Sequence, residues 1–318
     1  MLVKTIIEEN NSDSSVISIN TFFKGNMIKM LISNFIILFK IFFALQKSDI
    51  IYFTPSRNLM SSFKDFIVLK YGKNKKIIAH LHGSDLHEFL NQGNFYHRNL
   101  NELFIKYVDC FIILSKSHKK FALGKDFSKY RIISNPLEYI NYKPIEKSRN
   151  KFEFCTISNP IAGKGLDNIL KKLNSLSIKS KFILNVVGWA EKDYVNIYGV
   201  TPELKNGCIV FHGRKDGVEK MKILSRSSFF IFLPSAIEAQ PLTVLEALSN
   251  KCIVILNRTE MLTDFLTYPN VVLEENITNE DELLLLKNDF NDDNKYMRLL
   301  DRLSINTFFK KIQSTFNL

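Results

Sequence analysis

The chain has 318 residues, of which 46% are hydrophobic and 24% charged. This size and composition favour two globular domains and exclude a disordered tail, a collagen and a small disulfide scaffold. The net charge of +11 is unevenly distributed, because residues 1–150 hold 22 basic and 12 acidic residues whereas residues 151–318 hold 21 and 20. We therefore expect one basic domain and one charge-balanced domain, with different partners.

The start of the chain and its cysteines indicate a reducing compartment. Glu8 and Glu9 interrupt the start, and no small-residue cleavage site follows an apolar stretch, so no cleavable signal is expected. The cysteines are widely spaced and lie within or beside apolar runs, which predicts buried thiols at Cys110, Cys155, Cys208 and Cys252. We therefore expect a cytoplasmic protein.

The apolar stretch from Ile28 to Leu45 predicts the first helix. Its longest charge-free piece, Met30–Phe39, has ten residues, whereas a membrane span needs about twenty. At about 100° per residue, a narrow basic stripe runs along one side of this helix, through Lys29, Ser33, Lys40 and Lys47. Two interpretations remain open: the helix packs on a sheet with one solvated edge, or it docks on an anionic membrane.

Short β-branched and aromatic runs alternate with longer helical patterns, which is typical of parallel sheets covered by helices. The predicted strands are Val16–Asn20, Ile50–Thr54, Lys76–His82, Cys110–Leu114 and Arg131–Ser134, followed by Phe152–Ser158, Phe182–Gly188, Cys208–His212, Phe229–Pro234, Cys252–Leu256 and Asn270–Leu273. This pattern predicts an α/β fold of two doubly wound, Rossmann-like domains facing a cleft. No G-x-G-x-x-G motif follows the first strand of either domain, so a nicotinamide or flavin dinucleotide is not expected.

A polar segment, Asn141–Lys151, carries a proline and four basic residues and is the predicted join between the domains. We place the first domain at residues 1–143 and the second at residues 144–294. The final stretch, Lys295–Phe316, has helical periodicity and leads to no further strand. Residues 295–318 are therefore predicted to form a helix that crosses back to the first domain.

The strongest chemical signal follows the apolar strand that begins at Phe229. A short loop presents Glu238, and Pro241 stands where a helix would begin, because its fixed φ suits the first helical position. The first helical amides would form an anion site for a diphosphate, through Leu242, Thr243 and Val244. Glu246 can accept both hydroxyls of a ribose, and Glu238 those of a sugar ring. The alternative is an ordinary charge pair at a helix start.

This glutamate pair is the last of seven short motifs. In order they are His82–Asp85, Leu114–Ser115, Asn135–Pro136, Gly163–Asp167, Val187–Gly188, Phe211–Gly213 and Glu238–Glu246. Together they resemble the family 4 glycosyltransferases with the GT-B fold, in which two glutamates have seven residues between them. The resemblance covers most of the chain. It implies an N-terminal acceptor-binding domain and a C-terminal domain that binds a nucleotide sugar.

The resemblance implies a role for each donor-binding residue. Lys164, beside Gly163, matches the lysine that neutralises the donor diphosphate. A merely solvated lysine is disfavoured there, because a cation at a helix start opposes the helix dipole. Glu246 matches the ribose ligand, Glu238 matches the glutamate that contacts the donor sugar, and the backbone around Gly213 is expected to meet the nucleobase.

On the acceptor side, His82 ends a predicted strand, with His80 two residues earlier on the same face. It matches the family's active-site histidine near the reacting sugar and the acceptor, whereas without the family a structural histidine would be the simpler interpretation. Gly83, Ser84 and Asp85 are expected to line the acceptor site. His82, Lys164 and Glu238 form the predicted catalytic set.

The sequence departs from the family at two places. The arginine that usually stands five residues before the lysine is Asn159 here, so one phosphate cation is missing. Arg214 or Lys215 can compensate, or both are surface residues. Relatives also begin with a strand and a Gly-rich loop, whereas Val16–Asn20 looks like their second strand. This predicts an N-terminal domain that is truncated or a start site that is assigned too late, with a wider acceptor site.

The family resemblance implies a metal-independent, retaining hexosyltransferase without a cofactor, which moves a sugar from a UDP- or GDP-linked donor to a hydroxyl of a glycan acceptor. The acidic cluster Asp289–Asp293 is expected to be a helix cap or turn and not a metal site. The alternatives on the same fold are a sugar-nucleotide epimerase, a phosphorylase, and a catalytically impaired relative that only binds nucleotide sugars.

The basic first domain, with the runs Lys73–Lys76 and Lys119–Lys120, suits an acceptor carried on polyprenyl diphosphate. This favours a place in bacterial polysaccharide synthesis of the lipopolysaccharide or O-antigen type. We expect a peripheral position on the inner face of the plasma membrane. Nucleic acid is not expected as a partner, because the sequence has no basic motif interleaved with aromatic residues and no recognition helix.

Overall fold

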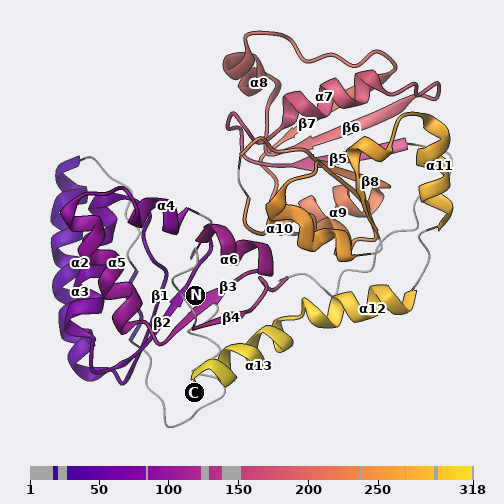
Figure 1. The fold of residues 1–318 in the computed structure, drawn as a ribbon. Coiled ribbons are helices and arrows are strands. Elements are labelled where there is room, and N and C mark those ends of the chain that lie inside the picture. Colours follow the sequence, from indigo (N-terminus) through magenta and orange to yellow (C-terminus); the bar gives the residue numbers. More distant parts are fainter. Residues whose placement is uncertain are drawn as a thin grey trace. The chain divides into compact units, whose positions relative to one another are not determined.

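A computed structural model describes residues 17–20, 27–83, 85–122, 129–137, 152–236, 238–268, 270–289 and 293–316 (Figure 1). The chain divides into two compact units. Unit 1 consists of the chain up to Ile133 together with the chain from Phe309 onward, and unit 2 runs from Ser134 to Phe308.

The division falls earlier than the predicted boundary between residues 143 and 144, and the return to unit 1 comes later than residue 295. The reason is packing in unit 2. The amide of Leu137 donates to the carbonyl of Leu303 at 3.0 Å, and both side chains lie in the core of unit 2 beside Leu299.

Unit 1 contains a parallel sheet in the order β1 (Ile50–Phe53), β2 (Lys76–His80), β3 (Cys110–Ile113) and β4 (Tyr130–Ile132). These strands confirm four of the predicted ones. The predicted strand at Val16–Asn20 is wrong for Ile17–Asn20, which form no strand, while Val16 lies outside the described residues. The formation of a strand depends on tertiary context as well as on β propensity, and here Ile19 packs against the core of unit 1 although these residues form no strand.

The helices of unit 1 are α2 (Met27–Lys47), α3 (Leu59–Tyr71), α4 (Leu86–Leu90), α5 (Phe95–Tyr107) and α6 (Lys116–Ala122), and the end of α13 (Ile305–Phe316) belongs to this unit. Local caps begin two of them, because the side chain of Asn58 accepts from Ser61 N and that of Asn94 from His97 N, both at 2.9 Å. One core joins α2, α3, α4 and α5 to the sheet.

Unit 2 contains a six-stranded sheet in the order β10 (Val271–Leu273), β9 (Ile253–Leu256), β8 (Phe229–Phe232), β5 (Phe152–Ile157), β6 (Phe182–Val187) and β7 (Gly207–Gly213). All neighbouring strands are parallel, and every one of them was predicted. If the six strands of unit 2 are numbered 1 to 6 along the chain, starting at β5, their order in the sheet from β7 is 3-2-1-4-5-6. This is the doubly wound order of a Rossmann-like domain.

Helices cover both faces of this sheet (Figure 1). On one face lie α9 (Gly217–Arg226), α10 (Leu242–Ser249) and α12 (Asp293–Arg302); on the other lie α7 (Leu166–Ser175), α8 (Glu191–Tyr198) and α11 (Glu280–Asp289). Two 3-10 helices, η1 (Glu260–Thr267) and η2 (Glu274–Asn276), flank β10. The strands between the helix layers are apolar nearly throughout, because both of their sides are buried.

The prediction of four buried cysteines is corrected at one position. Cys110, Cys155 and Cys252 are buried, but Cys208 is exposed. Cys208 lies on β7, the edge strand, where alternate side chains such as Cys208 and Val210 are exposed. Among the described helices, none combines the length and the hydropathy needed for a transmembrane segment.

Candidate functional site

The main site of unit 2 lies where the strand order of its sheet reverses. β5 and β8 are neighbours in the sheet, and the helices that follow them, α7 and α10, pack on opposite faces. The chain therefore leaves the two strands toward opposite faces of the sheet, at its carboxyl edge. This is where open α/β sheets bind ligands. Lys164 lies on the first of these loops and Glu238 on the second.

The two loops are tied together through backbone. The carbonyl of Gly163 accepts from the amides of Ser235 at 2.9 Å and Ala236 at 3.1 Å. Gly165 has a φ of +86°, and a Cβ there would stand 2.0 Å from the carbonyl oxygen of Leu233. Glycine is required at this point for both its conformation and its lack of a side chain. The two glycines thus anchor Lys164 between them.

Lys164 Nζ forms an ion pair with Glu238 Oε1 across the two loops. The side chains are 26% and 20% exposed, so the pair is partly shielded but remains open to solvent. The residues that the sequence assigned to the donor diphosphate and the donor sugar therefore lie in direct contact. A charge-assisted hydrogen bond of this kind orients both groups.

The N-terminus of α10 follows immediately. Pro241 has a φ of −65° but is the residue before the helix, which begins at Leu242, so the predicted first helical position is one residue too early. The amide of Val244 donates to the carbonyl of Pro241 at 3.1 Å, which corrects the prediction that this amide is available to a ligand. The amides of Leu242 and Thr243 donate to no acceptor among the described residues, so two amides remain to meet an anion.

Glu246 has a partner that the sequence did not suggest. Lys220 Nζ, from α9, lies 2.7 Å from Glu246 Oε1, and the two side chains are 18% and 12% exposed. This well-shielded contact restrains the carboxylate predicted to hold a ribose. Lys220 and Glu246 are far apart in sequence, and only the packing of α9 against α10 brings them together.

The carboxyl ends of β6 and β7 lie at the same edge of the sheet as those of β5 and β8, because the strands are parallel. Gly188 N donates to Gly213 O at 2.7 Å, and Gly213 N donates to Trp189 O at 3.0 Å. Gly213 has a φ of +63°, and a Cβ there would meet nothing within 4 Å, so its surroundings are open. This is the position predicted to meet a nucleobase.

Asn159, which replaces the arginine of the family pattern, is exposed on the loop after β5. The two cations considered as substitutes are engaged elsewhere on the surface: Arg214 pairs with Asp216 and Lys215 with Glu219, each at 3.2 Å. This arrangement agrees with the surface role that the sequence left open.

In unit 1, His82 lies just beyond β2 and its ring packs against that of His80, with the ring centroids 4.2 Å apart and the planes tilted by 34°. His80 is buried, and its Nδ1 shares a hydrogen bond with the hydroxyl of Tyr52. Burial, with the nearby His82 and His118, holds the pKa of His80 well below its usual range, while burial raises the pKa of Tyr52. The Tyr52 hydroxyl is therefore protonated and the imidazole of His80 is neutral.

His118 of α6 fixes the loop after β2. Its Nδ1 accepts from the amide of Leu114 at 3.0 Å and its Nε2 donates to the carbonyl of Gly83 at 2.8 Å. Burial, chiefly, lowers the pKa of His118, which favours this neutral form. Asp85 pairs with Arg57 at 2.6 Å, and Arg57 lies over Gly83.

The structure therefore gathers the predicted residues into two groups. Lys164, Glu238 and the start of α10 meet in unit 2, and His82 lies with its neighbours in unit 1, whereas Ser84 lies outside the described residues. Lys220, His118 and Arg57 were missed, because no local spacing links them to their partners. In the described part of the chain, no three His, Cys, Asp or Glu side chains are grouped as metal ligands would be.

Sequence comparison relates the chain to known transferases. Residues 141–297 match the family described as Glycosyl transferases group 1. A relative from Methanocaldococcus jannaschii, described as an uncharacterized glycosyltransferase, is 30% identical over 213 residues. The aligned part covers 60% of this chain and 53% of the relative, so the chain spans about half the length of the curated relative it matches.

Solved structures share the fold. A trehalose-6-phosphate synthase superposes with a TM-score of 0.62 at 14% identity, covering 92% of this chain and 79% of that one. Anabaena HepE in complex with UDP-glucose gives a TM-score of 0.59 at 15% identity, covering 88% and 82%, and S. aureus TarM gives 0.59 at 18%, covering 89% and 59%. At these identities the likeness concerns the fold. The chain thus shares its α/β fold with these solved structures, and its residues 141–297 match the family described as Glycosyl transferases group 1.

Proposed function

We propose that the protein is a retaining glycosyltransferase that moves a sugar from a UDP- or GDP-linked donor to a hydroxyl of a glycan acceptor. The observation that carries the proposal is the meeting of Lys164 and Glu238 just before the N-terminus of α10, at the switch point of unit 2. HepE, whose fold is similar, binds UDP-glucose and UDP.

The donor would be held by charge and by hydrogen bonds from unit 2. The ammonium of Lys164 and the amides of Leu242 and Thr243 are suited to the diphosphate, because all three present positive charge to an anion. Glu238 and Glu246 would accept hydrogen bonds from the hydroxyls of the sugar and the ribose, and the open backbone at Gly213 leaves room for the base.

In the proposed reaction, the bond between the anomeric carbon and the phosphate oxygen breaks, and a bond to the acceptor oxygen forms on the same face. The acceptor hydroxyl gives its proton to an oxygen of the departing diphosphate, so no protein nucleophile is required. Lys164 and the α10 amides stabilise the negative charge that develops on the leaving group. No metal is required in this scheme, because these groups supply the positive charge.

Unit 1 would bind the acceptor, with His82 beside the reacting hydroxyl and Gly83, Ser84 and Asp85 lining the site. The excess of basic residues in the first half of the chain suits an acceptor carried on polyprenyl diphosphate at an anionic membrane. We propose that the reaction belongs to bacterial surface polysaccharide synthesis and takes place on the inner face of the plasma membrane.

The test is to incubate the protein with UDP- and GDP-sugars, with and without a polyprenyl-diphosphate glycan, and to identify the products by mass. A glycan that is one sugar longer, formed only with both substrates present, supports the proposal. An altered sugar nucleotide or a sugar phosphate formed without acceptor would indicate an epimerase or a phosphorylase. Nucleotide binding without turnover would indicate an impaired relative, and loss of activity with a chelator, restored by magnesium, would contradict the metal-independent scheme.

A further inference from the structure

Helix α2 of unit 1 is apolar on two sides. Its inner side packs into the core through Ile41 and Leu45, which are 7% exposed. Its outer side carries large apolar residues that are between 37% and 64% exposed, namely Ile32, Phe35, Ile36, Phe39, Phe42 and Phe43, and we call these six residues the outer face of α2. Burial in the core accounts for the first side only.

The outer face is continuous. At about 100° per residue its six side chains fall within an arc of roughly 120°, and among the other described side chains of α2 only Gln46 falls within this arc. Phe35 and Phe39 are in edge contact, with centroids 5.0 Å apart, and Phe42 contacts Tyr71 of α3 at 5.5 Å. Tyr71 is itself 55% exposed, so the apolar surface continues onto α3.

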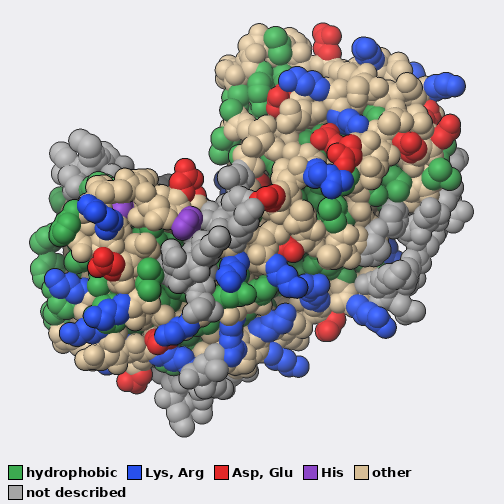
Figure 2. Space-filling model, viewed as in Figure 1, with side chains coloured by type: hydrophobic (Ala, Val, Ile, Leu, Met, Phe, Trp, Pro, Cys, Tyr) green, Lys and Arg blue, Asp and Glu red, His purple; other side chains and the backbone are tan. Residues whose placement is uncertain are grey.

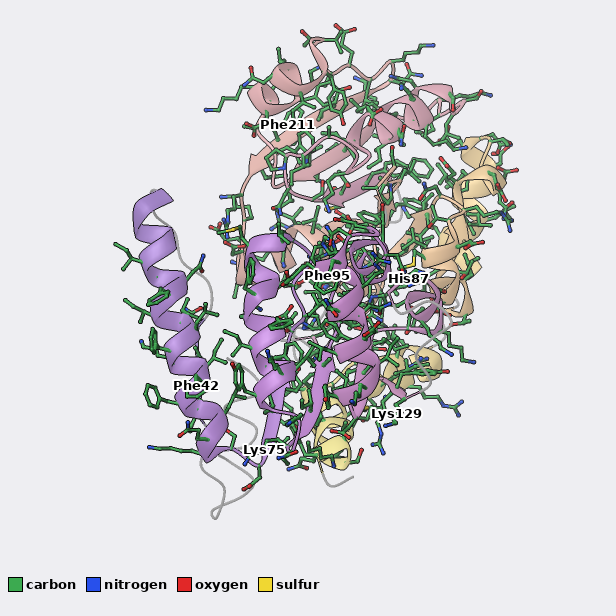
Figure 3. The ribbon with its side chains drawn as sticks, turned by 60° about the vertical axis from the view of Figure 1, so that its left-hand side comes forward. Phe42, Lys75, His87, Phe95, Lys129 and Phe211 are labelled. Atoms are coloured by element: carbon green, nitrogen blue, oxygen red, sulfur yellow. The ribbon has the colours of Figure 1, made fainter. Side chains whose placement is uncertain are left out.

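This surface lies at the margin of unit 1. Hydrophobic side chains follow the edge of the unit formed by α2 in Figure 2, and Figure 3 shows α2 as the outermost helix beside α3, with side chains projecting away from the unit. Contiguous exposed apolar surface of this kind marks a site of interaction with a protein or a membrane.

Basic residues border the outer face. Lys40 and Lys47 are exposed and follow next around the helix from Ile36, and α2 contains no acidic residue. The exposed Lys73 and the half-buried Lys75 lie in the turn before β2, and the amide of Lys76 donates to the carbonyl of Asp49, just beyond the end of α2. An apolar face with a cationic edge is the pattern of a helix that lies in the plane of an anionic membrane.

A second copy of the chain fits this surface less well. A two-fold contact through the outer face would bring two copies of the same basic edge together, and α2 offers no acidic side chain to offset them. A bilayer with anionic lipids satisfies both features, because its acyl region receives the phenylalanines and its phosphates meet the lysines. Since α2 does not qualify as a transmembrane segment, such a helix would lie along the surface.

We infer that the outer face of α2 docks unit 1 on a bilayer surface that carries anionic lipids. The inference rests on the proposed function and deepens it, because docking would bring unit 1 to the membrane that carries the proposed acceptor. It specifies the orientation: α2 lies in the interface, with its phenylalanines toward the acyl chains and Lys40 and Lys47 at the level of the phosphates.

The test is flotation of the full-length chain with two kinds of vesicle, phosphatidylcholine alone and equal parts of phosphatidylcholine and phosphatidylglycerol. The wild-type chain is expected to bind the anionic vesicles. A double variant, Phe35→Ser with Phe39→Ser, should lower the partition coefficient on the order of tenfold or more, since it removes two inserted rings. A second double variant, Lys40→Gln with Lys47→Gln, should lower binding to anionic vesicles about as much, because each lysine near the surface contributes about 1 kcal/mol.

Matched controls remove the same groups elsewhere. Phe95→Ser deletes a 77% exposed phenylalanine on α5, and Lys192→Gln with Lys222→Gln deletes two exposed charges of unit 2. Both controls should bind vesicles like the wild type. All positions are exposed, so unchanged thermal unfolding is expected in every variant.

Three outcomes would overturn the inference. The first is a wild-type chain that binds no vesicle, and the second is a pair of phenylalanine substitutions that binds like the wild type. The third is light scattering that shows a dimer for the wild-type chain and a monomer for the double variant Phe35→Ser with Phe39→Ser. UDP binding by calorimetry separates this inference from the proposed function: a wild-type chain that binds UDP but no vesicle overturns the docking surface alone, and a wild-type chain that binds anionic vesicles but no UDP overturns the donor site alone.

Discussion

Replacing Lys164 by methionine tests the electrostatic core of the proposed site. Methionine keeps most of the aliphatic stem and removes the charge. Loss of one preorganised group that stabilises a developing anion typically costs about 2.7–4 kcal/mol, so turnover should fall on the order of 10²–10³-fold. The effect on folding should be small, because the Lys164–Glu238 pair is partly solvent-exposed and such pairs contribute about 0–1 kcal/mol.

The measurement combines UDP affinity by calorimetry, product formation with a nucleotide sugar and lipid-linked acceptor, and urea unfolding. Lys171→Met is the matched control, since Lys171 is a 77% exposed lysine on the adjoining helix that pairs with Asp167 at 3.5 Å. The control should retain both UDP binding and turnover. If Lys164→Met binds UDP and turns over like this control, the assignment of Lys164 to the diphosphate is refuted. If Lys164→Met lowers both UDP binding and turnover, but its free energy of unfolding in urea falls by as much as the free energy of UDP binding, the role of Lys164 is structural.

Three further predictions concern single sites. Gly165→Ala should destabilise unit 2 by more than Gly199→Ala, because both residues have positive φ but only the first would bring a Cβ within 2.0 Å of a backbone oxygen; equal urea midpoints would refute the close approach. Burial raises the pKa of Asp65 from 3.8 to about 6, so the folded chain binds the proton of this carboxyl more tightly than the unfolded chain does. The stability that this proton contributes is therefore present below about pH 3.8 and is lost as the pH rises through 6. Asp65→Asn should therefore flatten the pH dependence of unfolding by up to about 3 kcal/mol, and an unchanged slope would contradict the shift. Lys220→Met should destabilise the chain by leaving the shielded carboxylate of Glu246 without its ammonium, and adding Glu246→Gln should recover part of the loss in a double-mutant cycle; additive losses would show that the pair is not coupled.

Sequence alone was sufficient to find each described strand of the two sheets, although it also predicted a strand at Val16–Asn20 that Ile17–Asn20 do not form. The strand from Phe229 and the strand from Ile253 are buried on both sides, and a short run that is apolar throughout can be recognised without knowing its neighbours. The loop containing Gly163 and Gly165 was also recognisable, because a glycine requirement arises from local backbone conformation and close approach. These features are local, and so the order of residues carries them.

Tertiary structure alone decided which side chains meet. Lys220 reaches Glu246 only because α9 and α10 pack side by side, and His118 reaches Gly83 only because β2 and β3 are neighbours. The exposure of Cys208 likewise depends on β7 being an edge strand, which its own sequence does not reveal. The apolar pattern of α2 predicted a helix with apolar residues on both sides, and only the packing against the sheet shows which side the core covers. Backbone form follows from nearby residues, whereas ion pairs, exposure and surfaces depend on residues that the chain brings together from a distance.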